Sequence, residues 1–279
     1  MEAFFFFLFR PTCGNTIPTS FCNACANAGR NVLLTIVGYS TINIGYKYNI
    51  IGVNFKGLTA DEQMDINDVF PYKDGMTQGG AMDSADQIQV RVGEGYEIYF
   101  LSNGKAGKTT KPELVGKWVR STATGTVSNK KFKSGDGFWY ISAKSNEQLA
   151  EAPYSVTVAG AVETVANGSP ALSGLYSIVS SPYPMDIPIN DGIIAVNGTQ
   201  GGSMDSADQI QIRYGDGYSI YFLSNGKAGK TTKPELVGKW VKSTATGVAT
   251  EDKLPAGKGF WFIRQSDATS LKIANPLAD

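Results

Sequence analysis

An internal repeat constrains the fold of this chain more than any other feature of its sequence. The string Met-Asp-Ser-Ala-Asp-Gln-Ile-Gln begins at Met82 and again at Met204, which is a spacing of 122 residues (204 − 82). Residues 98–119 and 220–241 are identical, and both copies contain a later Gly-Phe-Trp. A repeat of this length is that of a duplicated domain. The sequence therefore predicts two homologous modules, 33–154 and 155–279, after a separate segment, 1–32.

Each module has the pattern of short antiparallel strands. Ile88, Val90 and Val92 alternate with polar residues, and Gly93 and Gly95 then bracket a reversal before a second apolar run. Alternation with period two followed by glycines predicts a β-hairpin. Gly, Asn and Pro separate further short apolar runs at similar intervals, so we predict an all-β protein of two tandem sandwich-like or small-barrel-like modules.

Related apolar segments precede, separate and follow the two module bodies. They are residues 34–37, 155–159 and 270–274. An unpaired strand edge favours aggregation. We therefore predict that 155–159 is a strand hydrogen-bonded into a module sheet, with either neighbour as its partner.

Residues 1–32 match neither module, and we interpret them as a leader or a disordered tail that makes few contacts with the modules. The apolar run Phe4–Phe9 is far shorter than the ~20 residues of a membrane-spanning helix, so no transmembrane segment is expected. Cys13, Cys22 and Cys25 offer three ligands, whereas a structural zinc site usually needs four. No metal site is predicted there.

Composition narrows the possible functions. The chain has 25 Lys plus Arg and 25 Asp plus Glu, so no overall charge favours a nucleic-acid partner. It contains no histidine, which excludes every catalytic mechanism that needs an imidazole. Gly107-Lys108-Thr109 lacks the upstream glycine spacing of a phosphate-binding loop. We expect no cofactor and no enzyme activity.

Two acidic pairs are the candidates for a cation site, and both lie just before a predicted strand. They are Asp83 with Asp86, and Asp205 with Asp208. Calcium takes 6–8 oxygen ligands, and two carboxylates supply too few of them. The favoured interpretation is a polar turn in which Asp83 and Ser84 bond backbone amides. A glycosidase with paired carboxylates remains the third functional alternative.

Large aromatic residues on the predicted strands are the candidate ligand-binding residues. They are Tyr99, Trp118, Trp139, Tyr221, Trp240 and Trp261. If exposed, their rings offer flat surfaces to sugars; the alternative is a buried second layer of the core. Because the same residues flank both, Trp139 and Trp261 are expected to occupy equivalent environments.

The order of these motifs resembles a β-rich repeat module of bacterial secreted and cell-envelope proteins. The residues that carry the resemblance are Asp86-Gln-Ile-Gln-Val90, Tyr96-x-Ile-Tyr-Phe100, Lys117-Trp118 and Gly135-x-Gly-Phe-Trp139, with their second copies. The resemblance implies an exported, non-catalytic protein, located outside the cell or in its envelope, and we predict a structural or adhesive role for it. Its partners would be glycans or other envelope proteins, and a pair of carbohydrate-binding modules is the alternative.

Overall fold

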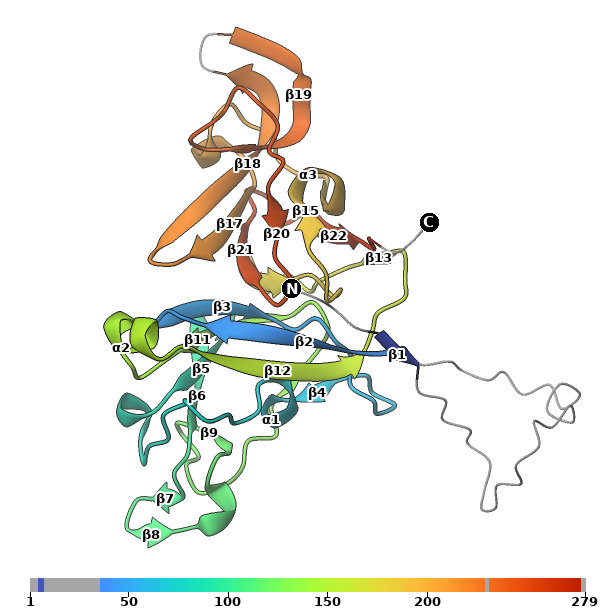
Figure 1. The fold of residues 1–279 in the computed structure, drawn as a ribbon. Coiled ribbons are helices and arrows are strands. Elements are labelled where there is room, and N and C mark those ends of the chain that lie inside the picture. The colour runs from blue at the N-terminus through green and yellow to red at the C-terminus, as the bar shows by residue number, and fades with distance from the viewer. Residues whose placement is uncertain (1–4, 8–35, 229–230, 277–279) are drawn as a thin grey trace, which may run out of the picture.

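The structure, a computed structural model, describes residues 5–7, 36–228 and 231–276. Strands arranged in antiparallel sheets are its main regular structure, with a few short helices between them (Figure 1). The all-β prediction is confirmed.

Two five-stranded sheets have the same strand order. The first sheet runs β3 (Tyr48–Gly52), β11 (Gly137–Ile141), β5 (Gln87–Val92), β6 (Gly95–Leu101), β9 (Trp118–Arg120). The second runs β14 (Tyr176–Ser180), β21 (Gly259–Ile263), β17 (Gln209–Tyr214), β18 (Gly217–Ala228), β19 (Thr231–Lys242). The predicted hairpins are β5–β6 and β17–β18, where Gly93 (φ 58°) and Gly215 (φ 59°) take the backbone conformation that such tight turns need.

Smaller elements surround these sheets. The short paired strands are β4 (Met64–Asp65) with β10 (Lys131–Phe132), β7 (Lys105–Ala106) with β8 (Thr109–Thr110), and β15 (Ile187–Pro188) with β20 (Lys253–Leu254). A three-stranded sheet has the order β13 (Asn167–Gly168), β22 (Ser270–Ala274), β16 (Ile193–Val196). The α-helices are α1 (Ile66–Val69), α2 (Asn146–Glu151) and α3 (Ile189–Gly192), and the 3₁₀ turns are η2 (Met82–Ser84), η3 (Pro112–Leu114) and η4 (Met204–Ser206).

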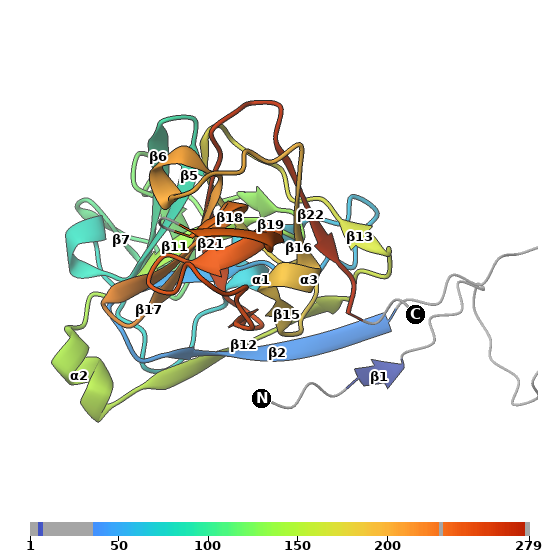
Figure 2. The same cartoon turned by 90° about the horizontal axis from the view of Figure 1, so that it is seen from above.

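The segment between the repeats is a strand, as predicted. β12 (Tyr154–Ala161) pairs antiparallel with β2 (Ile36–Ile44) along its whole length, and Figure 2 shows the two strands along one side of the molecule. The predicted boundary at 154/155 therefore coincides with the start of a strand that lies with the earlier residues. We call residues 36–161 the first half and residues 162–276 the second half.

One short strand comes from the N-terminal segment. β1 (Phe5–Phe7) pairs antiparallel with β2 at Ile36–Gly38. That residues 1–32 make few contacts with the modules stays a prediction, because the other residues of this segment lie outside the described ones. The three cysteines lie outside the described residues.

Each half has its own buried core around a tryptophan. Trp118 is 0% exposed and Trp240 is 1% exposed, and their indole N–H groups donate to the carbonyl oxygens of Phe70 and Ile193. A buried indole needs such a partner, so both tryptophans are fixed in orientation.

In the part of the chain that the structure describes, no helix has the length and hydropathy needed to cross a bilayer.

The halves meet along a seam formed by the edge strands β3 and β14 and the residues just before β11 and β21. The Gly52 N–H donates to the Gly257 carbonyl (2.9 Å), and the Ser180 N–H donates to the Gly135 carbonyl (2.8 Å). Gly52 in β3 has the same position as Ser180 in β14, and Gly135 corresponds to Gly257. The same contact is therefore made once in each direction, as across the two-fold axis of a symmetric dimer.

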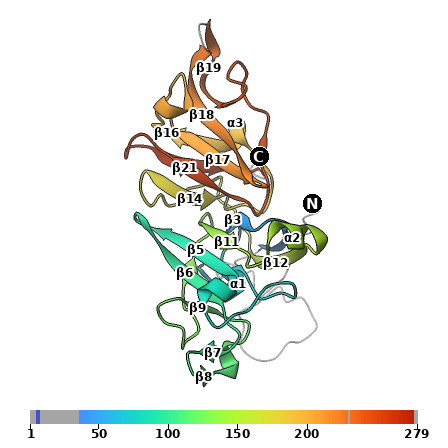
Figure 3. The same cartoon turned by 90° about the vertical axis from the view of Figure 1, so that its left-hand side faces the viewer.

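Two arginines cross the seam in the same reciprocal way. Arg91 Nε donates to the Tyr176 carbonyl (2.9 Å), while Arg213 Nε donates to the Tyr48 carbonyl (3.0 Å). Each arginine lies on the hairpin of one half and donates a hydrogen bond to the edge strand of the other half. Figure 3 shows each hairpin reaching toward the opposite half. The angle between the halves is thus set by directed hydrogen bonds from both sides.

Candidate functional site

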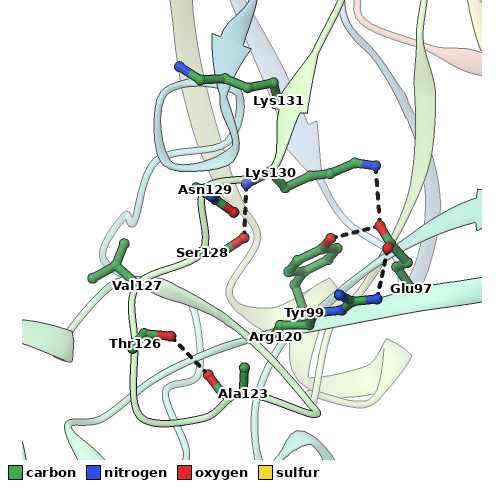
Figure 4. Close-up of a pocket in the computed structure, with 10 residues that line it drawn as sticks. All are labelled: Glu97, Tyr99, Arg120, Ala123, Thr126, Val127, Ser128, Asn129, Lys130 and Lys131. Atoms are coloured by element: carbon green, nitrogen blue, oxygen red, sulfur yellow. Dashed lines mark hydrogen bonds and ion pairs between the residues drawn. The ribbon is translucent and has the colours of Figure 1, made fainter.

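One hollow on the described surface lies in the first half, between strand β6 and the loop before β10. It has a volume of about 470 Å³ and is open to solvent. Figure 4 shows the side chains around it, which include Glu97, Tyr99, Arg120 and Lys130. Glu97 accepts from Arg120 (2.8 Å), from Lys130 (3.2 Å) and from the Tyr99 hydroxyl (2.9 Å).

These contacts determine the protonation states of Glu97 and Tyr99. Burial by itself raises the pKa of Glu97, but hydrogen bonds from Tyr99 and Lys130 and the charges of Lys130 and Arg120 outweigh it, so the pKa lies below its usual value. Burial and the neighbouring Glu97 raise the pKa of Tyr99 far above its usual value. At neutral pH, Glu97 is an ion with two cationic partners and Tyr99 is neutral. Neither group is suited to proton transfer.

The equivalent place in the second half has the same tyrosine with a different arrangement of charge. Tyr221 corresponds to Tyr99, and its hydroxyl donates to Asp252 (2.7 Å), which also pairs with Lys242 (3.0 Å). Asp252 takes the place of Lys130, and Ser219 takes the place of Glu97. The carboxylate thus comes from a different position in each half, Glu97 in the first and Asp252 in the second, but in both it contacts the tyrosine hydroxyl and a cationic side chain. This contact stabilises the loop in both halves.

Removing the Glu97 carboxylate is expected to make stability less dependent on pH. A depressed pKa in the folded state stabilises the fold above the unfolded-state pKa of about 4.3, and this contribution is lost as the pH falls through the folded-state pKa. We expect Glu97→Gln to lower the free energy of unfolding by about 1 kcal/mol at pH 7. Below the folded-state pKa, where the wild-type carboxylate is also protonated, we expect the difference to disappear.

Urea unfolding of both proteins at several pH values measures this difference. Glu113→Gln is the matched control, because Glu113 is exposed and has no ion pair among the described residues. A Glu97→Gln difference that stays constant from pH 7 to pH 3 would contradict the assignment.

Four of the six predicted ligand-binding residues are buried. Tyr99 is 3% exposed, Tyr221 is 1% exposed, and Trp118 and Trp240 are at the centres of the two cores. A sugar can stack only on a ring face that solvent reaches. These four positions therefore provide no open ring face, for the physical reason that each ring fills core volume.

The other two, Trp139 and Trp261, lie half-buried at the seam. The Arg213 guanidinium lies 5.8 Å from the ring centroid of Trp139, and the Arg91 guanidinium lies 5.6 Å from that of Trp261. Each tryptophan is thus covered by the arginine of the other half in a cation–π contact. The prediction that the two tryptophans occupy equivalent environments is confirmed.

The two acids of each candidate pair lie in different surroundings. Asp83 and Asp205 lie exposed on 3₁₀ turns, whereas Asp86 and Asp208 are fully buried. Among the described residues, no group of three or more acidic or cysteine side chains could hold a metal ion. The side chain that bonds backbone amides is Asp86 and not Asp83, because it accepts from Thr77 N–H (3.0 Å) and Ala143 N–H (2.7 Å).

Asp86 also organises a buried polar cluster. Besides the two amides, it accepts from the hydroxyls of Ser142, Tyr140 and Tyr154. Burial, together with the nearby Asp86 charge, raises the pKa of Tyr140 well above its usual value. Asp208 has the same role, since it accepts from Thr199 N–H (2.9 Å), Gln265 N–H (2.7 Å) and the Thr269 hydroxyl. Both carboxylates tie the start of a hairpin strand to distant loops.

No known family, curated protein or solved structure is found to match this chain. Its function must therefore be argued from its own residues.

The residues that sequence reasoning missed are those of the seam: Arg91, Arg213 and the tyrosines beside them. A signal for them exists in the sequence. Trp139 shares a sheet face with Gln89, since the two are cross-strand neighbours, and Arg91 follows on that face by the period of two. A tryptophan among polar residues indicates that this face is covered by another part of the protein.

Proposed function

We propose that this chain is a non-catalytic, exported protein of the cell envelope with a structural or adhesive role. The observation that supports this best is the reciprocal seam, in which main-chain and arginine hydrogen bonds join the halves from both sides. Such a joint transmits force between halves, whereas a flexible linker does not. An adhesive protein under tension depends on that property.

The chemistry of the hollow beside Glu97 favours the same proposal. Its single acid is neutralised by Arg120 and Lys130, and its tyrosine stays protonated. No nucleophile with an adjacent base converges there. An ion-paired surface of this kind stabilises a loop and performs no evident reaction.

Localisation is the first test. An antibody against the chain should label intact, unpermeabilised cells of its source, and protease treatment of those cells should remove the signal. Labelling that requires permeabilisation would refute the exported role.

A seam variant tests the mechanical part of the proposal. A side chain at Gly52 meets Ser180 Cβ at 2.5 Å and the Lys258 carbonyl oxygen at 2.9 Å, so Gly52→Leu should force the seam apart. Gly45→Leu is the matched control, because nothing lies within 4 Å of a side chain placed there. In small-angle scattering we expect Gly52→Leu to increase the maximum dimension, and Gly45→Leu to leave it unchanged.

The same two variants displayed on cells connect the seam to function. We expect cells with Gly52→Leu to keep the surface label and lose attachment under shear, and cells with Gly45→Leu to behave as wild type. Equal attachment of both variants would show that a rigid seam is not needed.

A further inference from the structure

We propose that the tyrosines around Arg213 form a binding surface for a neutral polysaccharide chain. This surface, the tyrosine platform, consists of Tyr46, Tyr48 and Tyr218 and includes none of the six aromatic residues predicted from the sequence. The inference rests on the proposed adhesive function and names the class of ligand that it would use.

The platform is built by both halves around one partly buried guanidinium, that of Arg213. The Arg213 guanidinium lies 5.6 Å from the ring centroid of Tyr48 and 5.4 Å from that of Tyr218. Its side chain is only 12% exposed, while the two tyrosines are 42% and 40% exposed. The arginine thus supports the rings from within, and the rings face solvent.

Tyr46 extends the same surface. It is 46% exposed, and its ring lies beside Gly215 at the tip of the β17–β18 hairpin, where a Cβ would meet Tyr46 Cε1 at 3.3 Å. The hairpin tip is held in place by the Asn146 side chain of α2, which donates to Asp216 (2.9 Å). Figure 1 shows this hairpin reaching down toward α2. The rings therefore belong to a fixed surface and not to a free loop.

Exposed rings this close together are uncommon on a monomeric surface and mark interaction sites. Tyrosine offers a flat apolar face at low entropic cost and keeps a hydroxyl for hydrogen bonds. A pyranose presents the matching chemistry, with an apolar C–H face and hydroxyls around its rim. The platform is an open surface, so it fits the side of an extended chain better than a single terminal sugar.

The polar groups at the edge favour a neutral ligand. Lys47 Nζ, a donor, lies 5.6 Å from the Tyr48 centroid, and Asp216, an acceptor, is 70% exposed. Sugar hydroxyls both donate and accept, so they use donors and acceptors together. A nucleic acid instead needs a continuous row of cations for its phosphates, and the carboxylate of Asp216 opposes it.

The mirror position in the other half provides an internal comparison. Arg91 lies 5.8 Å from the Tyr96 centroid, but Gly174 and Leu175 stand where the platform has Tyr46 and Lys47. The second position thus lacks one ring and the cationic donor. Binding is expected mainly at the Arg213 side.

The test uses the full chain and three soluble neutral polysaccharides, a β-glucan, a xylan and a galactomannan, with affinity electrophoresis and calorimetry as readouts. We expect at least one of them to bind. Tyr48→Ala and Tyr218→Ala should each weaken that binding by ~10-fold or more, as for central interface aromatics. Tyr48→Phe and Tyr218→Phe should retain it, because they keep the ring.

Two further variants separate loss of the site from loss of the fold. Tyr46→Ala removes a ring that lies beside the hairpin tip and is expected to weaken binding with an unchanged thermal midpoint. Tyr72→Ala is the matched control, because Tyr72 is equally exposed (42%) and lies beside Gly116, away from the seam. We expect it to leave binding unchanged.

The proposal is overturned if none of the three polysaccharides binds, if Tyr72→Ala weakens binding as much as Tyr48→Ala, or if single-stranded DNA binds more tightly than every polysaccharide. Surface labelling of intact cells is independent of these results. If the antibody labels intact cells but the chain binds no polysaccharide, only this inference is overturned. If the antibody does not label intact cells, the exported role itself is overturned.

Discussion

Replacing Phe138 with alanine is expected to lower the free energy of unfolding by about 3–5 kcal/mol, the usual cost of removing a fully buried phenyl ring. Phe138 is 0% exposed, and its ring contacts those of Phe70 and Phe132, with centroids 6.0 and 5.3 Å away. The change removes buried apolar surface and also these ring contacts. Urea unfolding followed by tryptophan fluorescence measures the loss.

The second half allows a comparison at the equivalent position. Phe260 is also 0% exposed, but Ile193 and Leu254 occupy the places of Phe70 and Phe132. Aromatic pairs contribute roughly 0.5–1.5 kcal/mol beyond buried area, so Phe260→Ala should cost about 1 kcal/mol less than Phe138→Ala. Val127→Ala, at an exposed site, serves as the control and should stay within about 0.5 kcal/mol of wild type. A Phe138→Ala loss below about 1 kcal/mol would contradict the packing described here.

Replacing Asp86 with alanine is expected to have an effect of similar size for a different reason. It leaves the Thr77 and Ala143 amides without their acceptor and removes one partner of the buried Tyr140 hydroxyl, which keeps its contact with the Tyr154 hydroxyl. Each unsatisfied buried group costs about 1–3 kcal/mol, so the total loss should be about 3–5 kcal/mol after partial relaxation. Asp208→Ala should behave alike, since it removes the acceptor of the Thr199 and Gln265 amides.

Asp83→Ala is the control for this pair, because Asp83 belongs to the same Asp-x-x-Asp string and is exposed. Chemical denaturation at pH 7 measures all three variants. A small loss for Asp86→Ala, near that of Asp83→Ala, would mean that solvent reaches the cluster and replaces the carboxylate.

The sequence predicted local structure well, because strands and turns depend on neighbouring residues. Alternation at Ile88, Val90 and Val92 and the glycines after them were enough for the hairpin. The burial of Phe138 and Tyr140 on one face of β11 follows from the same period of two. The identity of residues 98–119 with 220–241 accounts in part for the shared strand order of the two five-stranded sheets.

Contacts between the halves could not be predicted in this way. Arg91 and Arg213 have the pattern of solvent-facing strand residues, and nothing nearby in the chain specifies that each reaches the edge strand of the other half. Whether the candidate aromatics are exposed was open for a related reason, since periodicity assigns Tyr99 to a face but not to the inside or outside of the protein. The sequence could not specify the pairing partner of β12, because the segments before and after it both resemble it. In the structure β12 pairs with β2 over eight residues without a register shift.

The reciprocal seam also has a consequence for how these chains behave when crowded. Each half offers the other a complete set of partners, so the second half of one chain fits the first half of another chain equally well. Between Ala161 and Tyr176 the connection is held by the short strand β13, by the Val162 N–H donating to the Ile36 carbonyl (2.8 Å) and by the Lys56–Glu163 ion pair (3.0 Å). The two halves can therefore pair within one chain or between two chains. The covalent link gives the halves of one chain a high effective concentration for each other, which favours pairing within the chain. Exchange would become competitive only where many chains are held together at high local density.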